Sequence, residues 1–236
     1  AISGIDHDPA TGQPVGAATG RLAASTDSQS LNDLVRAQTA SLPAGSLQSG
    51  TGGPAVALTD HLASAALSQL ADRLCAAPGV VTLAIPATGA LTLANQSWGT
   101  PTTPQLRCVE GIIGAGDALA LTGDSSGAGI LVVRNADMIL SGTMHWEGLI
   151  LVTGSEVSLK AGASSTTDVF GAIVINEIGN PGLGAFALDI QGGLRASFSR
   201  LALNRIATLI PSSEFAALYA RLPVSIKQDY WRSVSP

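Results

Sequence analysis

Charge is scarce in this chain, and the scarcity argues against several classes of protein. Only 12% of the 236 residues are Asp, Glu, Lys or Arg, and the formal net charge is −5. No basic run occurs, so the chain lacks the electrostatic footprint of a nucleic-acid-binding protein or of one that binds an anionic membrane surface. We therefore expect no nucleic-acid partner. The low charge also argues against the highly charged class of disordered chain.

Aromatic residues, cysteines and long apolar runs are scarce as well. Aromatics make up 4% of the chain, and there are two cysteines, Cys75 and Cys108. No apolar run reaches the roughly 18 residues that a membrane-spanning helix needs. Neither cysteine belongs to a CxxC motif, which argues against a metal or redox site. We expect no metal and no cofactor.

The even number of cysteines leaves two interpretations open. A disulfide between Cys75 and Cys108 would indicate an oxidising compartment and would restrict the unfolded chain by about 3–4 kcal/mol in the entropic description. Two buried free thiols in a cytosolic protein are the alternative. We favour the disulfide, and with it an extracytoplasmic location.

What the chain does contain is a repeat of short apolar strands. Gly129, Gly148 and Gly171 each lead four apolar residues, and between them lies a second type of strand that ends in glycine, at residues 119–123, 138–142, 157–162 and 188–192. Steps of about 20 residues with this strand–turn–strand pattern predict stacked coils, because one unit cannot bury its apolar side alone. The sequence therefore predicts a mainly β fold, a β-solenoid, with the three glycines as structural turns at the start of strands.

The repeat divides the chain into three regions. Residues 1–77 form a loop and helix region, with a weak helical pattern followed by a firmer helix from about Asp60 to Cys75. Residues 78–210 form the solenoid. Residues 211–236 are expected to form a short helix and a cap on the last coil, since an open solenoid end invites pairing with other strands.

One candidate site precedes a glycine-led strand, at His145, Trp146 and Glu147. In an extended segment His145 and Glu147 share one face, so an acid/base pair is conceivable. Two other interpretations stay open. In the first, the segment is an exposed corner and Trp146 packs between neighbouring coils. In the second, the three residues form a binding surface for a sugar ring.

A second candidate site depends on stacking between coils. Equivalent positions of neighbouring coils lie about 4.8 Å apart, so Asp137 and Glu156 could form the carboxylate pair of a polysaccharide-acting enzyme. The other charges are scattered, mostly one per strand, which is typical of a solvated face. We therefore predict that the protein is not an enzyme.

Several segments resemble a known family, the PilX-type assembly proteins of Gram-negative type IV pili. The segments that carry the resemblance are Gly127–Val133, Trp146–Gly154, Phe170–Asn176, the opening Ile2–Asp8, and the closing Ser197–Leu203 with Trp231 and Arg232. The resemblance implies a pilin-like membrane helix upstream of Ala1, other pilins or pilus-assembly proteins as partners, and no catalytic residues. It also implies a location in the periplasm, anchored in the inner membrane, or on the pilus or cell surface. The chain opens without an initiator Met, as expected of a processed or truncated product.

The leading hypothesis is accordingly a non-enzymatic structural component of a type IV pilus or a related filament, the soluble domain of a minor pilin-like protein. The alternatives are a surface adhesin that binds glycan near Trp146 or the 180–184 loop, and a polysaccharide-acting enzyme. A self-assembling cytoskeletal solenoid resembling the bactofilins is a further alternative. The terminal caps, the cysteines and the long non-repetitive N-terminal region argue against it.

Overall fold

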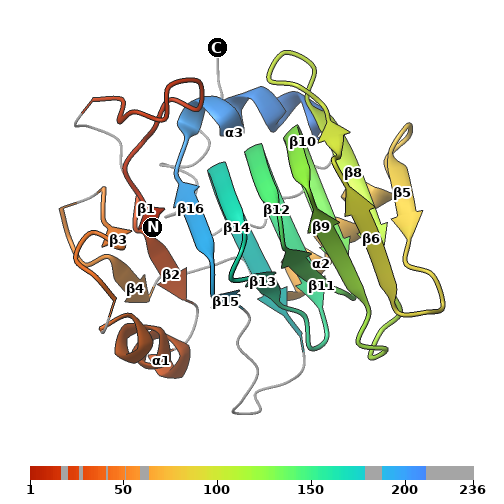
Figure 1. Cartoon of the computed structure of the whole chain (residues 1–236), viewed down its shortest axis with the longest axis horizontal. Helices are drawn as coiled ribbons and strands as arrows, with labels where there is room; N and C mark the ends of the chain where they lie inside the picture. The colour runs from red at the N-terminus through yellow and green to blue at the C-terminus, as the bar shows by residue number, and fades with distance from the viewer. Residues whose placement is uncertain are drawn as a thin grey trace.

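The computed structural model describes residues 1–16, 21–26, 29–40, 42–50, 52–58, 64–178 and 188–210. These residues form a β-solenoid of about five turns, in which parallel strands stack coil upon coil, so the predicted fold class is confirmed. Helices α1 (Gln29–Thr39), α2 (Ser64–Cys75) and α3 (Arg200–Ile206) lie around the stack (Figure 1).

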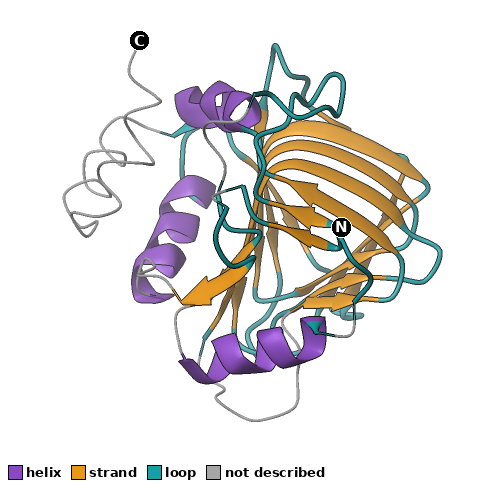
Figure 2. Cartoon of the chain, turned by 90° about the vertical axis from the view of Figure 1, so that its left-hand side faces the viewer, coloured by secondary structure: helices purple, strands orange, loops and turns teal. Residues whose placement is uncertain are grey.

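Two sheets face each other across the solenoid. In the larger sheet the strand order is β3-β1-β16-β14-β12-β10-β8-β5, with β7 also paired to β10; in the smaller it is β15-β13-β11-β9-β6. Figure 2 shows the long strands of the larger sheet curving around one side. The strands of the larger sheet are β1 (Ile2–Ser3), β3 (Leu47–Gln48), β5 (Val81–Ala84), β7 (Ser97–Trp98), β8 (Gln105–Glu110), β10 (Asp124–Arg134), β12 (Thr143–Gly154), β14 (Thr166–Glu177) and β16 (Gly193–Ser197). Those of the smaller are β6 (Ala90–Ala94), β9 (Ala118–Thr122), β11 (Asp137–Leu140), β13 (Leu159–Ala161) and β15 (Leu188–Ile190).

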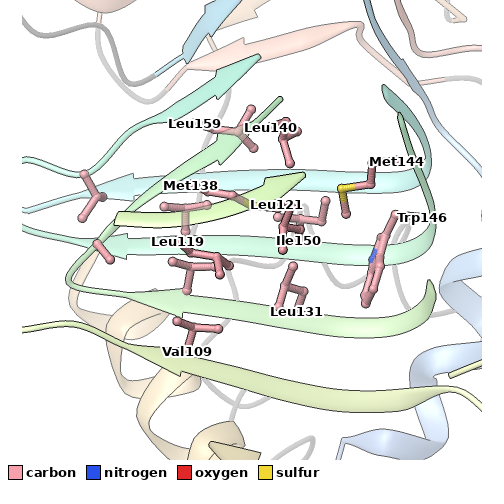
Figure 3. Close-up of a cluster of buried hydrophobic side chains, with 14 of the residues drawn as sticks. Val109, Leu119, Leu121, Leu131, Met138, Leu140, Met144, Trp146, Ile150 and Leu159 are labelled. Carbon is pink, nitrogen blue, oxygen red and sulfur yellow. The ribbon is translucent and has the colours of Figure 1, made fainter. Parts of the chain in front are cut away.

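The core is a set of aliphatic columns that run through the stack (Figure 3). Leu119, Met138 and Leu159 pair in register in successive coils, and all three are fully buried. Across the core, Ile150 and Leu131 of the larger sheet are equally buried. Fully burying one such side chain contributes about 1.5–3 kcal/mol, so the columns are the main source of stability.

The three predicted turn glycines lie inside long strands and not at their starts, which corrects that prediction. Gly129, Gly148 and Gly171 pair with one another in register within β10, β12 and β14. Their φ angles are 143°, 133° and 139°, a region that favours glycine. A Cβ atom at Gly148 would overlap the carbonyl oxygen of Gly129 in the next coil. The glycines therefore bend the strands where the backbones approach most closely.

The N-terminal region joins the solenoid at its far end. Strand β1 pairs with β16 of the last coil and with β3, and the Ala1 ammonium donates to the Leu194 carbonyl oxygen at 2.6 Å. A third, two-stranded sheet joins β2 (Ala24–Thr26) and β4 (Val56–Leu58). The first residues of the chain thus cover the last coil and lie far from the first (Figure 1).

The helices agree with the predictions in part. The predicted helix ending at Cys75 is α2, described from Ser64, and the weaker helical pattern before it is α1. Helix α3 and a 3-10 turn at Ala207–Leu209 lie within the range assigned to the solenoid. Ser199 caps α3, because its side chain accepts a hydrogen bond from the Ala202 amide. The predicted C-terminal helix and cap, in residues 211–236, lie outside the described residues.

Helices α2 and α3 bury the outer side of the second half of the long strands. Leu70 and Leu74 of α2 and Ile206 of α3 pack on Ile130 and Val132 of β10. The predicted disulfide is present and joins Cys75, the last residue of α2, to Cys108 of β8.

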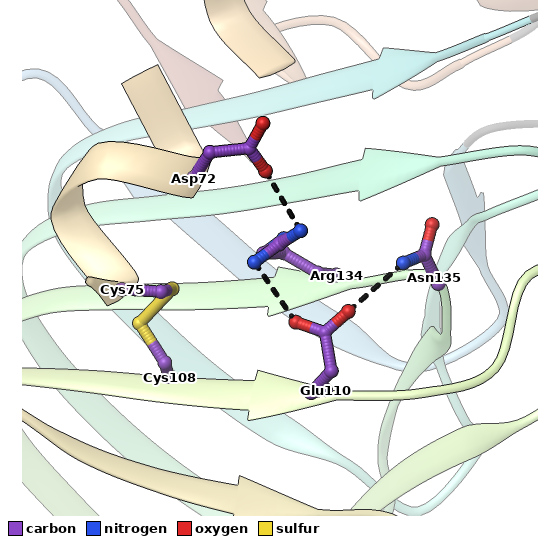
Figure 4. The surroundings of a disulfide bond; sticks show 6 residues. All are labelled: Asp72, Cys75, Cys108, Glu110, Arg134 and Asn135. Atoms are coloured by element: carbon purple, nitrogen blue, oxygen red, sulfur yellow. Dashed lines mark hydrogen bonds and ion pairs between the residues drawn. A yellow bond between two sulfur atoms is a disulfide. The ribbon is translucent and has the colours of Figure 1, made fainter. Parts of the chain in front are cut away.

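Beside the disulfide, a short chain of polar contacts ties α2 to the sheet (Figure 4). Arg134 forms ion pairs with Asp72 of α2 at 2.7 Å and with Glu110 of β8 at 3.1 Å, and Asn135 donates to Glu110 at 3.0 Å. Helix α2 is therefore fixed to the solenoid by apolar packing, by a covalent bond and by charge.

We predict that Gly148→Ala strongly destabilises the fold. A side chain at this φ costs about 1–3 kcal/mol in backbone strain, and the overlap with Gly129 adds to that cost. Urea denaturation followed by circular dichroism measures the loss. The matched control is Gly162→Ala, whose added Cβ would meet the Leu140 carbonyl oxygen at an ordinary 3.5 Å. Equal stability of the two variants would contradict the role assigned to the bend.

We predict that replacing Cys75 and Cys108 together with alanine lowers the free energy of unfolding by about 3–4 kcal/mol. The physical reason is the release of a loop that spans 33 positions of sequence. The wild-type chain in reductant should unfold at nearly the same urea concentration as the double variant. A loss of unfolding free energy below about 1 kcal/mol would contradict the prediction. It would mean that the disulfide restricts the unfolded chain much less than the entropic description requires.

Candidate functional site

Polar side chains gather on the outer side of the first half of the long strands. His145, Asp168 and Arg195 lie beside one another in register on β12, β14 and β16. Glu147 is on the same side of β12, and Arg205 reaches it from α3. We call these five residues the charged face. Sequence reasoning identified His145 and Glu147 but missed the other three, because stacking and α3 bring them together over large separations in sequence.

Glu147 is the buried centre of the charged face. Its side chain is 9% exposed, and Arg205 Nη1 lies 2.6 Å from its Oε2 atom. His145 Nε2 lies 3.6 Å from the other carboxylate oxygen, while the imidazole remains 43% exposed. Because His145 and Glu147 do share one face, that expectation is confirmed. The carboxylate is held between a guanidinium and an imidazole.

A second ion pair bridges two coils of the charged face. Arg195 donates from Nε and Nη2 to the two oxygens of Asp168, at 2.8 and 2.7 Å. The guanidinium also lies over the ring of Phe170, 5.5 Å from its centroid. Such a two-pronged arrangement fixes both side chains. The charged face is therefore a set of matched charges with the His145 imidazole exposed among them.

Trp146 lies in the core, which corrects its assignment to a possible binding surface. Its side chain is fully buried, and it belongs to the same cluster as Met144 and Ile150. Gly127 pairs with it in register, and a Cβ atom there would overlap the indole ring. The alternative interpretation, packing between neighbouring coils, is the one that the structure supports. Trp146 is not available to stack on a sugar.

The predicted carboxylate pair of Asp137 and Glu156 has other partners. Asp137 accepts hydrogen bonds from the backbone amide and hydroxyl of Ser158, both at 2.8 Å, and forms an ion pair with Lys160 at 2.6 Å. Its contacts are those of a structural link between coils. Glu156 instead influences Glu177, whose pKa is raised above its usual 4.5 by burial first and by the Glu156 charge second. The sequence signal that was missed is that these two glutamates lie about one repeat apart.

Within the ranges that the structure describes, no group of three or more His, Cys, Asp or Glu side chains could hold a metal ion. In the same ranges no helix has the length and apolar character needed to cross a membrane. Comparison of the chain with known protein families, with curated proteins and with solved structures found no match. The class of the protein is therefore defined by its fold, a disulfide-bonded β-solenoid.

We predict that Glu177→Gln stabilises the protein at neutral pH and gives no gain near pH 4. Because the pKa of Glu177 is raised in the folded state, its ionisation opposes folding, and stability falls as the pH rises above 4.5. Glutamine removes that loss. Thermal unfolding of both proteins between pH 4 and pH 7 provides the measurement.

The control for this prediction is Asp124→Asn, which removes an exposed carboxylate from the start of β10. It leaves Glu156 and Glu177 in place, so an effect of lowering the net negative charge in general would appear in both variants. A Glu177→Gln profile parallel to that of the wild type would show that the Glu177 environment does not oppose ionisation.

Proposed function

We propose that this chain is a non-enzymatic, extracytoplasmic structural domain of a type IV pilus or a related filament. The observation that carries the proposal is the cross-bracing of the coil stack. Helix α3 packs against β10, β12 and β14, and helix α2 packs against these three strands and β8. Successive coils are thus joined by backbone pairing and also by helices that run across them. A stack of this kind resists being pulled apart, which suits a component of a filament under load.

Two further contacts support a load-bearing role. The Cys75–Cys108 disulfide links α2 to the second coil and is compatible with an oxidising compartment. At the other end of α2, the side-chain amide nitrogen of Asn176 lies 3.0 Å from the Ser64 carbonyl oxygen, 3.1 Å from Ser68 Oγ and 2.9 Å from Thr153 Oγ1, and its two hydrogens can serve two of these acceptors at a time. The helix is therefore tied to the sheet near both of its ends.

An adhesin is the second candidate, and the charged face is the observation that favours it. The Arg195 side chain is 50% exposed and the His145 imidazole is 43% exposed, on a surface whose geometry is fixed by ion pairs. With Trp146 in the core, recognition on this face would depend on charge and hydrogen bonding. Stacking on a sugar ring would not contribute.

Filament fractionation in the organism that encodes the chain tests the proposal. A tagged chain should appear in the sheared pilus fraction and should crosslink to pilins, and its deletion should reduce the number of surface filaments. Absence from that fraction together with unchanged filament number would overturn the proposal.

Complementation with an Asp168→Ala/Arg195→Ala variant separates the two candidates, because both partners of this surface pair are removed together and neither charge is left without the other. A purely structural component should restore both filaments and attachment to surfaces. An adhesin that uses the charged face should restore filaments and lose attachment.

A further inference from the structure

The first coil of the solenoid differs from every later coil in its lack of charge. From Leu74 to Leu106 the chain has no Asp, Glu, Lys, Arg or His over 33 consecutive residues. This run includes β5, β6 and β7. Natural proteins usually protect the edges of sheets with charged side chains, above all lysine, because an uncharged edge pairs readily with another strand. The first coil has no such protection.

Both sheets end at this coil with an open edge. Among the described residues β5 pairs only with β8, and β6 pairs only with β9. The amide of Ile85 donates toward the second coil, to Glu110, and the amide of Asn95 does so to Thr122. Since amide directions alternate along a strand, the amides of Thr82 and Thr92 point outward. Within the part of the chain that the structure describes, both edges therefore present backbone donors without a partner.

The described residues also cover the core less completely at this end. Leu91 and Leu93 of β6 are only partly buried, whereas their register partners in the next coil, Leu119 and Leu121, are 0% and 2% exposed. Leu83 of β5 shows the same contrast with its partner Val109. One more layer of strands would bury all three leucines as completely as their partners.

The opposite end of the stack is different. There β1 lies on the last coil and β3 lies on β1, so the N-terminal region extends the larger sheet by two strands. The two ends of the solenoid therefore differ: at the far end the larger sheet ends in N-terminal strands and the smaller sheet in β15, whereas at the first coil the sheets end in β5 and β6. We therefore expect a copy of the chain that pairs through its open first coil to do so with the first coil of its partner. Such a contact is isologous and closes at two copies.

We propose that the open first coil is a docking surface for a second copy of this chain, and that two solenoids join end to end in a closed dimer. The β5 edges pair antiparallel about the two-fold axis, and the exposed leucines of the two cores bury one another. Charge favours this occupant. The chain carries a net charge of −5, yet the uncharged run brings no like charges together when two copies meet. The inference does not depend on the proposed function.

The test compares backbone and side-chain changes at the same two positions. Thr82→Pro/Thr92→Pro removes the two outward donors, and an edge strand tolerates proline. The matched control, Thr82→Val/Thr92→Val, keeps both amides and the shape of the side chains. Sedimentation velocity over a range of concentrations should show a monomer–dimer equilibrium for the wild type and the valine control. The proline variant should associate at least about tenfold more weakly, a difference of 1.4 kcal/mol.

Hydrogen exchange of the wild-type chain provides a second measurement, which holds even if the proline variant does not fold. The amides of Thr82 and Thr92 should become protected as the concentration rises. A chain that stays monomeric overturns the proposal. Protection in that monomer would mean that the rest of the chain covers the edge, and protection only after pilins are added would mean that a filament partner does. A dimer that the proline changes leave intact, or growth into long polymers, also overturns it.

Discussion

Side chains at the same height in successive coils of this protein must fit one another, because the strands pair in parallel and in register with those of the next coil. The constraint is severe where backbones approach most closely. At the level of Gly129, Gly148 and Gly171 the carbonyl oxygen of one coil occupies the space that a Cβ atom of the next would need. At other levels the same constraint sorts residues by size. Gly127 lies in register with both Trp98 and Trp146, so a residue without a side chain separates two large rings.

The outer side of the long strands differs between their two halves. The second half lies beneath α2 and α3, and its outward residues join a second hydrophobic cluster around Leu74 and Ile206. The first half carries the charged face, where only Glu147 is buried and is matched by Arg205. Burying a carboxylate without a partner would be costly, so α3 both covers apolar surface and neutralises that charge.

These features decide what could be predicted from the sequence. The apolar second halves of the long strands stand out as glycine-led runs, so the solenoid and its spacing are visible in the sequence alone. The first halves, such as 124–128, are polar or made of small residues, and they resemble loops. The sequence pattern consequently places the glycines at the start of strands, although they lie in the middle. The pairing of Cys75 with Cys108 was accessible because the chain offers no other pair of cysteines.

The arrangement of the charged groups could not be predicted from the sequence. A repeat indicates which positions can stack, but it does not say which way a turn directs a side chain. The spacing of one repeat fits the pair Asp137 and Glu156 as well as it fits the pair Glu156 and Glu177. Only the folded structure shows that the Asp137 side chain turns toward Ser158 and Lys160. The attachment of β1 to the last coil is harder still to predict, because two residues paired across nearly the whole length of the chain leave no local pattern. That attachment makes the two ends of the stack unlike each other, with N-terminal strands over one end and an uncharged edge at the other.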